Sequence, residues 1–287
     1  MTLAELVPIA LKISILAIVF SLGLAARPAE LIYLFRRPRE LARSLLVMCV
    51  LMPLLAYALV QVFSLPRPVA IVLIALSLAP VPPLLPRKQA KAHGDEAYSI
   101  GLLVAVALIS VVWIPLALEI NQRVFGLPLG VPIGAVAKVV AMTVLAPLIA
   151  GVVVAKFAPG LAPRLGRLFS TLGWLLLLTA AVLVLASQWR VIASLVHDGT
   201  LVAMALFVVI GMAAGHLIGG PDPSDRTVLA TAACSRHPGV ALAISHLNFP
   251  DEHLIAAAVL LFLLVNMVLT IPYVFWRKRV GAAAAIA

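Results

Sequence analysis

The chain has 287 residues, of which 64% are hydrophobic and only 11% charged, and its formal net charge is +10. Soluble domains carry about 25% charged residues, so the composition excludes a soluble enzyme, a disordered chain and a secreted scaffold. It predicts an all-α polytopic membrane protein, in which Lys and Arg of cytoplasmic loops explain the positive charge better than nucleic-acid binding does. Cys49 and Cys234 lack disulfide or metal-ligand spacing, so we expect no metal and no cofactor.

Apolar runs separated by Pro, Gly or charged residues predict nine transmembrane helices, because one spanning helix uses about 20 apolar residues. Their expected ranges are 6–25, 42–63, 68–92, 97–118, 131–155, 168–188, 200–219, 227–247 and 253–275. The first range lacks the basic start and the cleavage site of a signal peptide, and so it is interpreted as a helix. We therefore expect one integral membrane domain over 1–287.

Lys and Arg divide unequally between the two sides of this arrangement. Alternate connections collect fifteen of them on one side: Arg27, Arg36, Arg37, Arg39, Arg43, Arg87, Lys88, Lys91, Lys156, Arg164, Arg167, Arg226, Arg277, Lys278 and Arg279. The opposite connections hold three, Arg67, Arg123 and Arg190. Because basic loops stay in the cytoplasm, the bias predicts a multi-pass cell-membrane protein with its N-terminus outside and its C-terminus inside.

The third and eighth segments contain helix breakers in their middles. The third holds Pro80, Pro82 and Pro83, and the eighth holds Pro238 followed by Gly239. One interpretation is a pair of kinked helices whose freed carbonyls are satisfied by neighbours. The other uses the order: the breaks fall in matching positions of two oppositely oriented halves, which predicts an inverted-repeat transporter with two crossing discontinuous helices and its substrate site at the breaks.

One charge lies deep in the predicted membrane. Arg236 is about 10 residues from either end of its segment, hence about 15 Å from either surface, and it directly precedes the second break. We predict it as a substrate-binding residue, together with its neighbours Ser235 and His237. The alternative is an arginine satisfied by backbone carbonyls that the breaks free. His237 could also carry a coupling proton.

Three further residues are predicted at the substrate site. Arg87, with Lys88, follows the first break by about one turn and would extend the cationic lining toward the cytoplasm, unless both are ordinary basic loop residues. Ser99 and Asn266 are polar groups inside predicted helices. Such groups also serve as hydrogen-bonding links between helices, which is the alternative for both.

Four stretches of the chain resemble the bile acid:sodium symporter family: ALKISILAIVFSLGL, the basic loop up to Pro53, LAPVPPLLPRKQAKAHGD and TAACSRHPGVALAISHLNF. The resemblance implies the nine-helix form of that fold. It implies a panel domain of helices 6–25, 131–155 and 168–188, and a core domain over 42–118 and 200–275. It also implies that the two broken helices cross in the core and that access alternates by relative motion of the two domains.

The family's sodium ligands are largely missing here. The positions that match ligands in sodium-coupled members are apolar or cationic in this chain: Met48, Leu85, Pro86, Leu103, Ala232 and Arg236. Only Ser99 matches the family residue. Since Leu, Pro and Ala side chains supply no oxygen, the resemblance implies a member with degenerate sodium sites, in which the Arg236 guanidinium stands where the family has a glutamine.

These observations predict a secondary active transporter of a small organic anion that works by alternating access without the family's sodium coupling. An arginine can hold a carboxylate bidentately. The expected partners are the anion, the lipid bilayer and, as a candidate, a proton. The alternatives are a sodium-dependent symporter with a rearranged ion site, a related-fold efflux carrier and a non-transporting sensor. An intramembrane enzyme is disfavoured, because no acid is placed to orient His237 beside Ser235. Substrate identity, transport direction and oligomeric state stay open.

Overall fold

The computed structural model describes residues 3–125, 130–196 and 199–284, which form helices, turns and loops with no strand. Within these described residues, six helices are long and apolar enough to cross a membrane: Pro38–Val62, Glu96–Ile120, Ile133–Phe157, Ala162–Ser194, Thr200–Ile218 and Ile255–Gly281. Ile9–Ala25 and Arg67–Leu78 are shorter apolar helices. The chain is thus an all-helical polytopic membrane protein, while the count of nine spans and the inverted repeat stay predictions.

The first half of the chain forms helices at or near the predicted ranges. The elements are α1 (Leu3–Ala25), α2 (Pro28–Leu31), η1 (Leu34–Arg36), α3 (Pro38–Leu45), η2 (Leu46–Leu51), α4 (Met52–Val62), α5 (Arg67–Leu78), α6 (Leu85–Lys91) and α7 (Glu96–Phe125). The prolines of the third predicted segment fall between α5 and α6, where residues 79–84 are not helical.

The second half contains the longest helix. Its elements are α8 (Ile133–Val140), η3 (Ala141–Leu145), α9 (Ala146–Phe157), α10 (Ala162–Ser194), α11 (Thr200–Ile218), α12 (Pro223–Cys234), α13 (Pro238–Asn248) and α14 (Ile255–Ala284). Helix α10 extends six residues beyond each end of the predicted range 168–188. The eighth predicted segment is divided into α12 and α13, with residues 235–237 between them.

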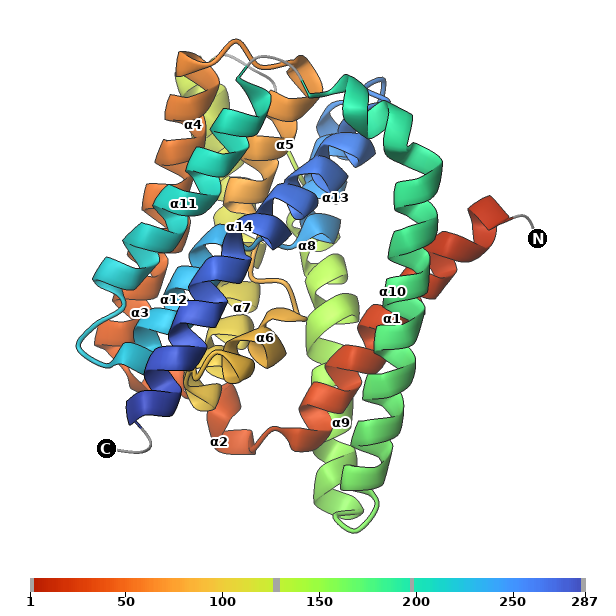
Figure 1. Ribbon diagram of the computed structural model, residues 1–287, viewed down its shortest axis with the longest axis vertical. Coiled ribbons are helices and arrows are strands. Elements are labelled where there is room, and N and C mark those ends of the chain that lie inside the picture. The colour runs from red at the N-terminus through yellow and green to blue at the C-terminus, as the bar shows by residue number, and fades with distance from the viewer. Residues whose placement is uncertain (1–2, 126–129, 197–198, 285–287) are drawn as a thin grey trace.

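The helices form two groups (Figure 1). At the right of the figure, α1 packs along both α9 and α10. At the left, α11 packs on α12, and α14 contacts α11, α5 and α13. Gly23 of α1 and Gly151 of α9 make the first group close-packed: a Cβ atom on Gly23 would lie 2.1 Å from the carbonyl oxygen of Leu148. The two backbones therefore meet where only glycine fits.

Two of the long apolar helices contain a π-helical stretch, η2 and η3. Each stretch ends just before a proline, Pro53 in α4 and Pro147 in α9. Proline lacks an N–H group and its ring crowds the carbonyl four residues earlier, so the helix widens locally ahead of it. As described below, both π-helical stretches place a residue against the second break.

Candidate functional site

The two interrupted segments touch at their breaks. Helices α5 and α12 both end in extended backbone, at Ala79 and Ser235. The backbone N–H of His237 donates a hydrogen bond of 2.8 Å to the carbonyl of Pro80, which joins one break to the other. We call residues 79–80 and 235–237 the crossing point.

Arg236 lies at the crossing point with 2% of its surface exposed, and its guanidinium binds only backbone in the hydrogen bonds found. Its Nε donates to the carbonyl of Ala233 at 3.1 Å, one terminal nitrogen to Ala79 at 3.2 Å and the other to Met48 at 3.3 Å. Ala233 and Ala79 lie at the C-terminal ends of α12 and α5, where helix dipoles favour a cation. The guanidinium thus links three helical segments.

The carbonyl of Met48 is available because of the π-helical stretch η2. The N–H of Met52 donates to Val47, five residues back, instead of to Met48. Pro53, the next residue along the helix, has no N–H group and so cannot donate to the Met48 carbonyl either. The helix therefore leaves the Met48 oxygen without its usual partner, and Arg236 supplies one.

His237 caps helix α13. Its Nδ1 accepts from the backbone N–H groups of Gly239 at 3.2 Å and Val240 at 3.4 Å, as an N-cap side chain does. Pro238 follows as the first residue of α13, the position where a missing N–H is least costly. The other ring nitrogen lies 3.5 Å from the hydroxyl of Thr143 in η3. His237 therefore connects the crossing point to the first helix group.

Asn266, on α14, links to the crossing point through Ser235 and the neighbouring Cys234. The amide of Asn266 donates to the carbonyl of Cys234 at 2.8 Å and accepts from the hydroxyl of Ser235 at 3.3 Å. Both side chains are buried, at 6% and 8% exposure. Four of the residues predicted for the site, counting Arg236 and His237, are thus brought together, and they are engaged with one another, with backbone and with Thr143.

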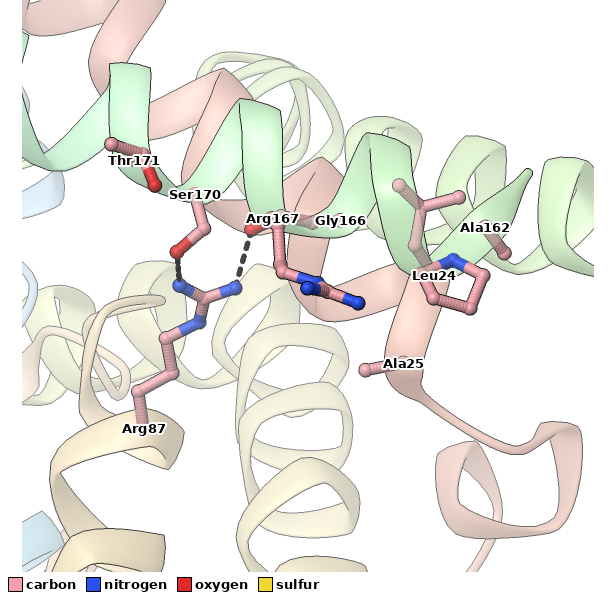
Figure 2. A pocket seen from close by; sticks show the side chains of 10 residues that line it. Leu24, Ala25, Arg87, Ala162, Gly166, Arg167, Ser170 and Thr171 are labelled. Carbon is pink, nitrogen blue, oxygen red and sulfur yellow. Dashed lines mark hydrogen bonds between the residues drawn. The ribbon is translucent and has the colours of Figure 1, made fainter.

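Arg87 lies elsewhere, in a cavity of about 430 Å³ between α1, α6 and α10 (Figure 2). Its guanidinium donates to the hydroxyl of Ser21 on α1 at 2.6 Å and to the hydroxyl of Ser170 on α10. The polar residues of the lining are Ser21, Arg87, Arg167, Ser170 and Thr171, and the rest of the lining is apolar. We call this space the arginine cavity. Ser235, Arg236 and His237 are not among its lining residues.

A smaller cavity of about 210 Å³ shares Arg87 with the arginine cavity. Its lining includes Ser99 and two carboxylates, Glu30 and Glu96, so we call it the acidic cavity. The Ser99 hydroxyl, on α7, donates to the carbonyl of Asp95, the residue just before that helix. Arg87 therefore has an environment without carboxylates on one side and an environment with two on the other.

The sequence reasoning missed the α1 and α10 sides of the arginine cavity. Arg167 was counted only as a loop charge, and Ser170, Thr171 and Ser21 were not singled out. Pro163, Arg167, Ser170 and Thr171 follow one another at intervals that place them on one face of a helix. That spacing was a usable signal, since an arginine and two hydroxyls on one face of an apolar helix need a polar partner.

The long apolar helices of the described residues define a polytopic membrane protein. A comparison with protein-family models matches residues 12–195 to the Sodium Bile acid symporter family. The chain belongs to this family, whose members are transporters and not enzymes. The matched range includes the first break and the whole arginine cavity, and it ends before α12 and α13. No curated protein sequence matches the chain significantly.

Proposed function

We propose that this protein is a secondary active carrier of a small organic anion, and that the anion binds in the arginine cavity. One observation carries the proposal: the guanidinium groups of Arg87 and Arg167 line the same cavity with three hydroxyls and no carboxylate. Arginine holds carboxylates through two parallel charge-assisted hydrogen bonds. A cavity with cations and hydroxyl donors on its walls and no acid favours an anionic occupant.

The position of the cavity fits alternating access. Its walls come from α1 and α10, which correspond to the predicted panel helices 6–25 and 168–188, and from α6, in the predicted core over 42–118. A movement of one group against the other would open and close a site between them. Arg87 and Arg167 belong to the side predicted to be cytoplasmic, so we propose that this site faces the cytoplasm.

We propose that transport does not require sodium. The carbonyls of Ala79, Met48 and Ala233 converge at the crossing point, and the Arg236 guanidinium already occupies them. A fixed cation there would repel a mobile one. We assign Arg236 to holding the crossing point together, and the substrate-binding role predicted for Ser235, Arg236, His237 and Asn266 is the alternative.

The experiment uses purified full-length protein. Mono- and dicarboxylates from acetate to adipate are screened by thermal shift, since a ligand that binds the folded state stabilises it. The best binder, radiolabelled, is then offered to proteoliposomes with an inward sodium gradient or with choline in its place. We expect equal uptake in the two conditions, and strong sodium stimulation would overturn the sodium-independent mechanism.

The binding site is tested in the same vesicles with Arg87→Gln. We expect it to weaken binding by about tenfold to a hundredfold, because charge-assisted hydrogen bonds are worth about 1.5–3 kcal/mol. Lys91→Gln is the matched control: Lys91 is an exposed cation on the same helix and does not line the cavity. If both variants bind as the unmodified protein does, the anion does not bind at Arg87.

A further inference from the structure

The arginine cavity contains two positive charges, and this number restricts the charge of its ligand. Arg87 contacts neutral hydroxyls, and Arg167 is exposed on α10, one turn before Thr171. Within the described residues the ion pairs are Arg37 with Glu40 and Arg123 with Glu119, so neither cavity arginine forms an ion pair with a carboxylate. A monoanion would balance one guanidinium and leave the other facing it unpaired.

We infer that the arginine cavity selects a dianion, a small dicarboxylate whose carboxylate groups pair with Arg87 and Arg167. This inference rests on the proposed function and specifies its substrate class. The two guanidiniums come from different helix groups, since Arg87 is on α6, which packs on α12 of the second group, and Arg167 is on α10 of the first. Figure 2 shows the side chains of Arg87 and Arg167 extending from these two helices into the same cavity. A ligand with two charged ends bridges the groups, whereas a ligand with one charged end cannot.

The acidic cavity, on the other side of Arg87, also favours binding of a dianion in the arginine cavity. Glu30 and Glu96 lie in its lining, and like charges in a confined space repel. A dianion is repelled there twice as strongly as a monoanion, so it is confined to the arginine cavity. Glu30 is held in place because its carboxylate accepts the backbone N–H of Arg27 at 2.8 Å.

Size and hydrogen bonding point to a small ligand. At about 430 Å³ the cavity lies toward the low end of the roughly 300–1,000 Å³ of small-molecule sites. Ser170 and Thr171 each offer a hydroxyl that can donate to the carboxylate oxygens left free by the guanidiniums, whereas the Ser21 hydroxyl already donates to the carbonyl of Ile18. The apolar remainder of the lining fits the carbon chain between the two carboxylates.

The test compares each dicarboxylate with its own monoamide, which has nearly the same shape and one charge fewer. Succinate and succinamate are the first pair, followed by the other pairs from oxalate to adipate. Binding to the purified full-length protein is measured by thermal shift and by equilibrium titration near neutral pH. We expect at least one diacid to bind about tenfold or more tightly than its monoamide, the factor that one lost charge-assisted pair gives.

Arg167→Gln should abolish this preference, so that diacid and monoamide bind with similar affinity, and Arg167→Lys should restore part of it. Arg164→Gln is the matched control, because Arg164 is exposed one turn earlier on α10 and does not line the cavity. The ligand-free melting temperature of each variant shows that it is folded. If monoamides or monocarboxylates bind as well as diacids, or if no diacid binds, the dianion inference is wrong and the anion carrier still stands. If no anion of either kind binds or is taken up, the proposed function itself fails.

Discussion

Two arginines, Arg236 and Arg87, each reach helices other than their own, but the atoms that accept their hydrogen bonds differ. Arg236 donates to three backbone carbonyls and is almost fully buried. Arg87 donates to two side-chain hydroxyls, is only partly buried and lies on the wall of a cavity. Both were predicted as substrate-binding residues from their position near a break.

The difference shows which guanidinium an anion can reach at low cost. The carbonyls around Arg236 lie at two helix ends and in the π-helical stretch η2, and they would be left without a donor if the arginine turned to a ligand. Ser21, by contrast, keeps its own hydrogen bond to the carbonyl of Ile18 when Arg87 leaves it. A carboxylate is also a stronger acceptor than a hydroxyl. Arg87 can therefore exchange partners, and Arg236 cannot do so without a loss of stability.

The largest expected effect is that of Arg236→Ala on stability. It leaves the oxygens of Ala233, Ala79 and Met48 buried without this donor, and each such loss costs about 1–3 kcal/mol. We expect the free energy of unfolding in detergent to fall by about 3–5 kcal/mol, measured by denaturant titration. Arg87→Gln should change it by less than about 1 kcal/mol while weakening anion binding.

Arg236→Lys tests whether Arg236 stabilises the fold or binds the anion, because this variant keeps the positive charge. Its ammonium has three donors on a flexible stem and should recover part of the lost stability. Should this variant stay fully stable yet lose anion binding, while Arg87→Gln keeps it, the anion binds at the crossing point and our assignment of the two arginines is reversed.

Much of the fold followed from the sequence because its signals are local. Long apolar runs and clustered prolines predict helices and the interruption at 79–84, and they place the second interruption just after residues 235–237, at Pro238, which is the first residue of α13. The contact of Pro80 with His237 and the partners of Arg236 were not predictable in this way. They depend on how distant segments pack, and the Met48 carbonyl is free only because Pro53 forces a π-helical stretch.

The candidate site was predicted in part for the same reason. Arg87 was named from its place after a break, but Arg167 was interpreted by its charge alone and Ser21 was not considered. Their importance comes from α1 and α10 meeting α6 in space. A charge count assigns every loop arginine the same role, and only the cavity separates Arg167 from Arg164.

The next effect concerns pH and helix α12, which carries Arg236 beyond one end and Asp225 in its first turn. Burial raises the pKa of the Asp225 carboxyl from 3.8 to about 6, and the charges of Asp222, Asp95 and Glu40 add to this rise against the opposing charge of Arg37. A raised pKa means that the folded state binds the proton more tightly than the unfolded state. Asp225 therefore stabilises the fold below about pH 4, and this stability is lost as the pH rises through about 6.

Asp225→Asn should remove that pH dependence and raise the free energy of unfolding near neutral pH by about 1 kcal/mol, less than the full shift would give because solvent screens the half-buried carboxyl, measured by unfolding at several pH values. Asp222→Asn is the contrasting control. The Asp222 carboxylate accepts from the backbone and hydroxyl of Ser224, and these hydrogen bonds lower its pKa. Neither Asp225→Asn nor Asp222→Asn should change anion binding, because neither residue lines the arginine cavity. A pH dependence unchanged in Asp225→Asn would mean that another group titrates.

The smallest expected effect distinguishes a cap from a proton carrier at His237. Its Nδ1 accepts from two N–H groups of α13, and protonation of that nitrogen would replace the acceptor with a donor and break the cap. His237→Ala should therefore cost about 1 kcal/mol, and His237→Asn should restore most of it because asparagine is a good N-cap residue. If His237 acts only as a cap, the asparagine variant also keeps the pH dependence of uptake in proteoliposomes. If instead that variant is stable but its uptake no longer responds to pH, His237 carries the coupling proton, and the crossing point takes part in transport beyond holding the two breaks together.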